Sequence, residues 1–319
     1  MLVHLFAVLV ALSTAVLIFA GGLVTSTGSG LSVPDWPNTY GWFMFAFPLE
    51  KMVGGIRYEH SHRLIASVVG MLIMALAFWL WRAEPRRWVR RLGFIALGAV
   101  VAQGLLGGIT VLWYLPDPIS IAHASLAQLV FCLTVTIALV TSPGWRRGYR
   151  PISSASATGA MLPAGALHRL TITTTVVIYL QIIIGATMRH TEAGLAIPDF
   201  PLVFGQLVPP QWDPKIAIHY AHRVGALIVT LLILATTLSV FRGNWQRPEL
   251  RRTSMLLLVL LPLQITLGAM TVLLNRPFVI NSLHVVTGAS VLVTSLVLTL
   301  RAHRARFGDT MDRPMGRAA

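Results

Sequence analysis

The stretch Glu59-His60-Ser61-His62-Arg63 has a counterpart 160 residues later, His219-Tyr220-Ala221-His222-Arg223 (222 − 62 = 160). A second pair of histidines, His123 and His284, is separated by almost the same distance (284 − 123 = 161). All four histidines lie in or beside long apolar runs, and a histidine inside a membrane is costly unless it is paired or bound. Four histidines kept in register therefore predict two sites, each with two imidazole ligands.

The composition is that of an integral membrane protein. The chain has 319 residues, of which 55% are hydrophobic and 11% charged, and its mean hydropathy is +0.72. Soluble domains contain about 25% charged residues, and a spanning helix needs roughly 20 apolar residues. We expect an all-α fold with eight transmembrane helices, at about 3–24, 64–81, 92–114, 120–141, 170–188, 222–241, 254–274 and 279–300.

An internal repeat surrounds the histidines. Residues 30–37 (GLSVPDWP) match residues 194–201 (GLAIPDFP), and residues 103–107 (QGLLG) match residues 264–268 (QITLG). Asp35 and Asp199, each between two prolines of the repeated loop, are expected to brace that loop. The repeat predicts two tandem four-helix bundles, 1–150 and 151–319, related by a pseudo-twofold axis along the membrane normal. Four-helix bundles commonly hold cofactors between facing helices.

Basic residues are concentrated on one side of the predicted topology. The net charge is +14, from 25 basic and 11 acidic residues. Eighteen of the basic residues share that side: Arg82, Arg86, Arg87, Arg90, Arg91, Arg146, Arg147, Arg150, Arg169, Arg242, Arg247, Arg251, Arg252, Arg301, Arg304, Arg306, Arg313 and Arg317. Because cytoplasmic loops are enriched in Lys and Arg, both termini are predicted to be cytoplasmic. The excess charge thus indicates topology and argues against a nucleic-acid partner.

The expected location is a bacterial or archaeal cytoplasmic membrane, with lipid around the helices, since no Arg- and Ser-rich targeting extension is present. The topology places all four histidines near the outer surface, because each lies near the start of a helix that runs from outside to inside. Two parallel helices of each copy then offer one imidazole each, which suits the two axial positions of a haem iron. Zinc fits less well, since it requires three or four clustered ligands.

Arg63 and Arg223 directly follow two of the predicted ligands, and two interpretations of them are open. One is snorkelling of the side chain to the membrane interface, and the other is pairing with haem propionates. Glu59 makes the copies unequal, since it lies one turn before His62 where the second copy has His219. A carboxylate beside one site only predicts that the two sites do different work.

Other polar residues in the helices have simpler interpretations. Three glutamines precede a glycine by four residues and are expected to serve helix packing: Gln103, Gln181 and Gln264. Four further histidines are expected to be solvated: His4, His168, His190 and His303. Cys132 is the only cysteine, so no intramolecular disulfide forms.

Together these motifs resemble the haem A synthase family of bacterial and mitochondrial membranes. The resemblance covers essentially all eight expected helices. It rests on Glu59-x-x-His62-Arg63, His123, His222-Arg223, His284 and the two Gly-Leu-x-x-Pro-Asp-x-Pro loops. It implies an oxidoreductase that converts the C8 methyl group of haem O to a formyl group through hydroxylated intermediates. Some members carry a cysteine pair in an outer loop, which this chain lacks, so no mechanism that requires such a pair operates here.

The resemblance also implies roles for individual residues. His222 and His284 would hold a resident haem b, whereas His62 and His123 would flank haem O as the substrate. Glu59 would be the catalytic glutamate, orienting a water molecule or stabilising positive charge. The implied protein partners are the haem O-producing enzyme and an electron acceptor that the sequence does not identify.

Two other functions remain open. A di-haem b-type electron-transfer cytochrome would bind haem in both copies without reaction on the porphyrin. Such proteins often place their ligands at two depths, whereas all four histidines here are expected at one depth. A transporter is a third possibility, because duplicated bundles are common among transporters. However, Pro262 is the only proline clearly inside an apolar run, so broken helices are not indicated.

Overall fold

The computed structural model describes residues 1–147 and 164–304, and within these ranges it is helical apart from loops and two isolated β-bridges. The helices are α1 (Leu2–Ser26), η1 (Met44–Ala46), η2 (Leu49–Lys51), α2 (Gly54–Ala83), α3 (Arg87–Leu112), α4 (Asp117–Thr141), α5 (Pro143–Arg146), α6 (Ala164–His190), α7 (Pro214–Gly243), α8 (Pro248–Leu273) and α9 (Phe278–Ala302). The predicted boundary between residues 150 and 151 lies outside the described residues, as do Arg150, Arg306, Arg313 and Arg317.

Eight of these helices are long and apolar enough to cross a membrane, which confirms the predicted fold class. Several of them begin earlier than expected, and the largest differences are in α2, at Gly54 instead of residue 64, and α7, at Pro214 instead of residue 222. Hydropathy misses these first turns because they contain polar residues. Local capping nevertheless makes α7 helical there, since the Asp213 side chain accepts hydrogen bonds from the N–H groups of Lys215 and Ile216.

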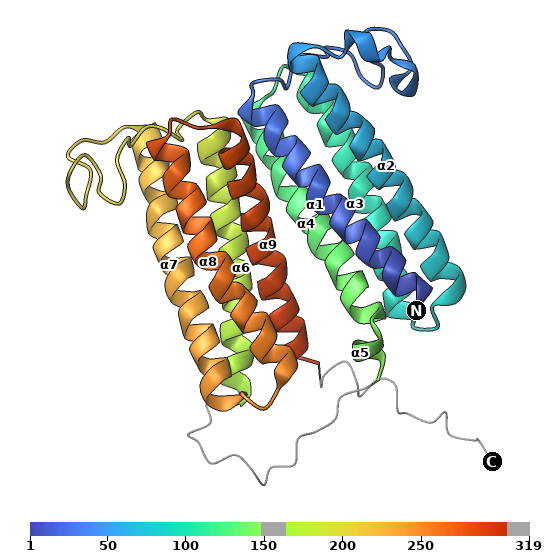
Figure 1. Ribbon diagram of the computed structural model, residues 1–319, viewed down its shortest axis with the longest axis vertical. Helices are drawn as coiled ribbons and strands as arrows, with labels where there is room; N and C mark the ends of the chain where they lie inside the picture. Colours follow the sequence, from blue (N-terminus) through green and yellow to red (C-terminus); the bar gives the residue numbers. More distant parts are fainter. Residues whose placement is uncertain (148–163, 305–319) are drawn as a thin grey trace.

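The long helices form two four-helix units, the first unit from α1 to α4 and the second unit from α6 to α9 (Figure 1). In the first unit α1 and α3 each contact both α2 and α4, so α2 and α4 occupy opposite corners. In the second unit α7 and α9 occupy opposite corners in the same way. Between the units α1 contacts α9, α4 contacts α6, and α4 contacts α9. Exchanging the units replaces α1 by α6 and α4 by α9. The contact of α1 with α9 then becomes that of α6 with α4, and the contact of α4 with α9 is unchanged, which is the pattern that the predicted pseudo-twofold requires.

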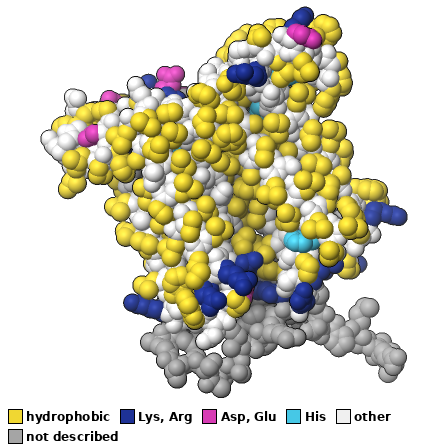
Figure 2. Space-filling model, viewed as in Figure 1, with side chains coloured by type: hydrophobic (Ala, Val, Ile, Leu, Met, Phe, Trp, Pro, Cys, Tyr) yellow, Lys and Arg dark blue, Asp and Glu magenta, His cyan; other side chains and the backbone are white. Residues whose placement is uncertain are grey.

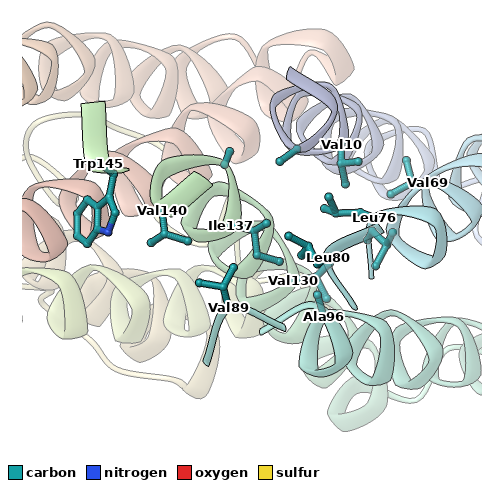
Figure 3. Close-up of a cluster of buried hydrophobic side chains, with 13 residues drawn as sticks. Val10, Val69, Leu76, Leu80, Val89, Ala96, Val130, Ile137, Val140 and Trp145 are labelled. Carbon is teal, nitrogen blue, oxygen red and sulfur yellow. The ribbon is translucent and has the colours of Figure 1, made fainter. Parts of the chain in front are cut away.

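Each unit has its own apolar core, farther along α2 and α7 than the histidines. Figure 3 shows the cluster of the first unit, in which Val10, Leu80 and Ile137 come from three different helices. Leu80 has a counterpart in Val240 of the second unit, and both side chains are fully buried. Because membrane helices associate mainly through van der Waals packing and interhelical hydrogen bonds, the paired cores explain why both units fold alike. They leave the histidine-bearing ends available for function.

The surface divides into an apolar band and a basic end. Figure 2 shows hydrophobic side chains over most of the visible face and Lys and Arg gathered toward one end. The start of α1 and the end of α9 lie at this same end (Figure 1). The distribution agrees with the positive-inside pattern. The side of the membrane that this end faces stays a prediction.

The expectation of solvated histidines was wrong for three residues at this end. His4 Nδ1 lies 2.9 Å from the carbonyl oxygen of Ala138, and His168 Nε2 lies 3.0 Å from that of Ala302. His303 is buried, and the centroid of its ring lies 4.3 Å from that of His168. The reason is a further pair in register (168 − 4 = 164), in which each histidine fastens the first helix of its unit to the last.

Candidate functional site

The four predicted ligands occupy equivalent positions in the two units. His62 and His222 lie eight residues after the first residue of α2 and α7, and His123 and His284 lie six residues after the first residue of α4 and α9. These helices occupy opposite corners of each unit, so the two histidines of a unit lie on helices that are opposed across the bundle. The structure therefore brings each predicted pair together, one pair in each unit.

Each imidazole packs against a glycine of a neighbouring helix. The four pairs are Gly21 with His62 (3.1 Å), Gly107 with His123 (3.0 Å), Gly185 with His222 (2.9 Å) and Gly268 with His284 (2.9 Å), where each distance joins Cε1 of the ring to a Cβ added at the glycine. Such distances are too short for ordinary contact between carbon atoms. A side chain at Gly185 or Gly268 would force a shift, and one at Gly21 or Gly107 would require the ring to give by a few tenths of an ångström.

Glutamines one turn before three of these glycines bond to the histidines. Nε2 of Gln181 donates a hydrogen bond to the carbonyl oxygen of His222 (2.7 Å) and lies 3.0 Å from Nδ1 of the ring. Gln103 donates in the same way to the carbonyl oxygen of His123 (3.0 Å). The predicted packing role for these glutamines was therefore incomplete, because they join two helices at the predicted ligands.

The third glutamine, Gln264, contacts His284 through both its side chain and its backbone. Its Nε2 lies 3.4 Å from Nε2 of His284, and its carbonyl oxygen lies 3.2 Å from Nδ1 of the same ring. An imidazole N–H held by a backbone carbonyl fixes the tautomer and the orientation of the ring. His284 is thus presented with a defined orientation toward the interior of the second unit.

Glu59 and His219 have the same local role in the two units. Oε2 of Glu59 accepts a hydrogen bond from the N–H of Val33 (2.8 Å). Nδ1 of His219 accepts one from the N–H of Ile197 (3.3 Å), the counterpart of Val33. Both acceptors are buried. What distinguishes the units is therefore charge, because only the first unit has a carboxylate at this place.

The arginines that follow His62 and His222 hold the outer loops. Arg63 donates a hydrogen bond to Oε1 of Glu59 at 2.6 Å, forming a buried ion pair. The loop carbonyl oxygens that accept from the arginines are those of Val33, Asp35 and Asn38 for Arg63, and Ile197, Asp199 and Leu202 for Arg223. These bonds fix each loop over the start of its helix. Pairing of the same arginines with haem propionates stays a prediction.

Asp35 and Asp199 brace the loops, as predicted. Each carboxylate accepts two backbone N–H groups at 2.8–2.9 Å, from Tyr40 and Gly41 in the first unit and from Phe204 and Gly205 in the second. The N–H of Gly205 lowers the pKa of Asp199 below its usual value. Burial acts to raise the pKa of Asp35, but hydrogen bonds from Gly41 and Tyr40 outweigh it and lower that pKa as well. Both loops are therefore held by ionised carboxylates at neutral pH.

One of the glycines beside the histidines, Gly21, was missed by sequence reasoning, although a signal for it was present. Gly21 and Gly185 are 164 residues apart, the same offset as the loops 30–37 and 194–201. Glycine in membrane helices is usually attributed to close helix packing, and no sequence pattern shows which side chain fills the space beside it. The partner became visible only with the helices in place.

Most of the chain matches the model of one known family. Residues 4–297 match the model of the cytochrome oxidase assembly proteins (COX15-CtaA). The chain belongs to this family. The matched range contains both units, all four histidines and Glu59.

Three curated relatives similar to this chain are named heme A synthase. The protein from Shouchella clausii is 31% identical over 244 residues, covering 74% of this chain and 76% of the relative. That from Symbiobacterium thermophilum is 31% identical over 264 residues, covering 81% and 82%. The Geobacillus kaustophilus protein is 26% identical over 324 residues, covering 98% and 96%. The similarity therefore extends through both units.

Proposed function

We propose that this protein is a haem A synthase, an oxidoreductase that converts the C8 methyl group of haem O to a formyl group through hydroxylated intermediates. The observation that carries the proposal is the pair of histidines at equivalent positions on opposite helices of each unit, with a carboxylate beside only one pair. Membership of the family and the name of the relatives support the same activity. The two units thus bind the same kind of ligand and use it differently.

In this proposal His222 and His284 hold a resident haem b, and His62 and His123 hold haem O. The residues fit such a group, because two imidazole nitrogens per site form the donor set of a six-coordinate haem. Nδ1 of His62 and of His123 is also buried without a hydrogen-bond partner among the described residues. Haem b, when bound, supplies reversible one-electron redox chemistry.

Glu59 acts on the substrate side. Oxidation withdraws electrons from the methyl carbon, so a fixed negative charge nearby stabilises the positive charge that develops there. The Val33 N–H and the Arg63 guanidinium orient the Glu59 carboxylate before any substrate arrives. The second role open to Glu59 is to orient a water molecule. Either role would make the carboxylate indispensable for the reaction.

The proposed location is a bacterial or archaeal cytoplasmic membrane, with both termini in the cytoplasm and both haem sites near the outer face. The gathering of Lys and Arg toward the end that holds the start of α1 and the end of α9 supports this sidedness. An electron acceptor and the enzyme that produces haem O are the expected partners.

Haem analysis of the purified protein tests the proposal. We expect a reduced-minus-oxidised spectrum of a b-type haem, and chromatography of extracted haem should show haem b together with haem O or haem A. Haem b alone, in two copies, would indicate an electron-transfer cytochrome. Absence of haem would indicate a transporter. Either of these two results would contradict the proposed activity.

Alanine at Gly268 should strip haem from the second unit. The new Cβ would lie 2.9 Å from Cε1 of His284, so the ring must move away from its position. We expect haem b per protein to fall by about tenfold or more, the scale of loss when support for a ligand is removed. Gly243→Ala is the matched control, because a Cβ there meets nothing within 4 Å. Equal haem content in the two variants would show that the glycine does not seat the ligand.

A further inference from the structure

Three of the four predicted ligands share one hydrogen-bonding device, and the fourth lacks it. The device is a glutamine placed four residues before the glycine that receives the imidazole. It occurs as Gln103 before Gly107, Gln181 before Gly185 and Gln264 before Gly268. Each of these glutamines bonds the histidine of the next helix through its ring, its backbone or both. Three occurrences in different helix pairs indicate a built contact.

In the second unit the helix that carries the histidine is also shaped to receive the glutamine. A Cβ added at Gly225, three residues after His222, would collide with Oε1 of Gln181. A Cβ added at Gly288, four residues after His284, would lie 3.0 Å from Nε2 of Gln264. In both helix pairs, α6 with α7 and α8 with α9, one glycine therefore packs against the imidazole and a second glycine packs against the glutamine amide.

The pair formed by α1 and α2 breaks the pattern. Gly21 receives His62 like the other glycines, but the residue four positions earlier is Leu17, which cannot form a hydrogen bond. Nδ1 of His62 is buried without a hydrogen-bond partner among the described residues, as is Nδ1 of His123, but His123 is also bonded by Gln103 through its backbone carbonyl oxygen. His62 is thus seated against a glycine, as the other three imidazoles are, without the amide that holds them.

We infer that Gln103, Gln181 and Gln264 are positioning residues for the haem ligands, and that Leu17 makes His62 the exchangeable ligand. The inference rests on the proposed function, because it concerns haem in both units. A resident haem has to stay, and both of its imidazoles are held. A substrate haem has to enter and leave as product, and one of its two imidazoles is free to move away. In that exchange the bond between iron and His62 breaks, and the imidazole leaves as a neutral group with its electron pair.

Carbon monoxide binding to the reduced protein tests the resident site. Carbon monoxide binds a six-coordinate haem only after one axial histidine has left, so its binding rate reports how firmly the histidines are held. In the purified holoprotein, we expect Gln181→Leu to raise this rate at the resident haem by about tenfold or more. Gln128→Leu is the matched control, a buried glutamine whose side-chain oxygen has no hydrogen-bond partner among the described residues, and should change the rate less than about twofold. The rate is read only from bound haem, so misfolded protein lowers the signal and leaves the rate unchanged. Equal rates in the two variants would overturn the positioning role.

The exchangeable ligand is tested in the first unit, with haem O added as the probe. We expect wild-type protein to bind carbon monoxide faster at this haem than at the resident haem. Leu17→Gln, which supplies the missing amide, should slow that binding by about tenfold, whereas Leu17→Met should not. An unchanged rate in Leu17→Gln would refute the role of Leu17. Both outcomes are read independently of haem A formation, so failure of the proposed activity would be seen separately, as haem O that is bound and never oxidised.

Discussion

Replacing Glu59 with alanine should stop haem A formation while the resident haem b stays bound. The carboxylate places a charged group near His62 where the second unit has the imidazole of His219. Loss of a charge that stabilises a transition state typically lowers a rate by 10²–10³-fold, so we expect a fall of at least about 100-fold. The product is measured by extracting haem from membranes and separating haem O from haem A. Haem b per protein should remain within about twofold of wild type.

Glu59→Ala also removes a structural contact, so a second variant has to separate the catalytic role of Glu59 from its role in holding the outer loop. In Glu59→Ala the Val33 N–H loses its acceptor and Arg63 loses its ion pair. Glu59→His copies the second unit, where His219 accepts the equivalent N–H beside an arginine. We expect this variant to fold and to retain haem b, yet to form as little haem A as Glu59→Ala. Wild-type product yield from Glu59→His would show that Glu59 only fastens the loop.

The helices and the pairing of the histidines could be predicted because they depend on local sequence. An apolar run of about 20 residues determines a spanning helix by itself, and the repeat offsets alone relate His62 to His222. The start of α2 at Gly54 could not be predicted in this way. Its first turns contain polar residues such as Glu59 and His60, which hydropathy assigns to a loop although they are buried in the structure.

The bonds around the predicted ligands could not be predicted, because they join residues far apart in the chain. Glu59 reaches the N–H of Val33 only because the outer loop folds back over α2. Gln181 reaches His222 only because α6 and α7 pack with a particular rotation. The sequence contained the repeated glutamine and glycine spacing, but packing alone was a sufficient reason for it. Helix packing and bonds to the histidines both explain this spacing, and only the contacts in the structure distinguish the two.

Replacing the histidines one at a time should divide them into two classes. His222→Ala and His284→Ala should each remove the resident haem, because an axial ligand is lost directly, and loss of mere support for a ligand already costs 10–100-fold. We expect haem b below about a tenth of the wild-type content in both variants. His62→Ala and His123→Ala should retain the resident haem and lose haem A formation, because only the substrate site is affected. The measurements are haem b per purified protein and haem A per membrane.

His4→Ala controls for the loss of any buried histidine, since His4 bonds a backbone carbonyl at the other end of α1 from Gly21. It should keep both haem b and haem A. The division into classes depends on the units doing different work with the same ligand set. If all four ligand variants lost haem b equally, the two sites would be equivalent. The single carboxylate at Glu59 would then have no part in distinguishing substrate from cofactor.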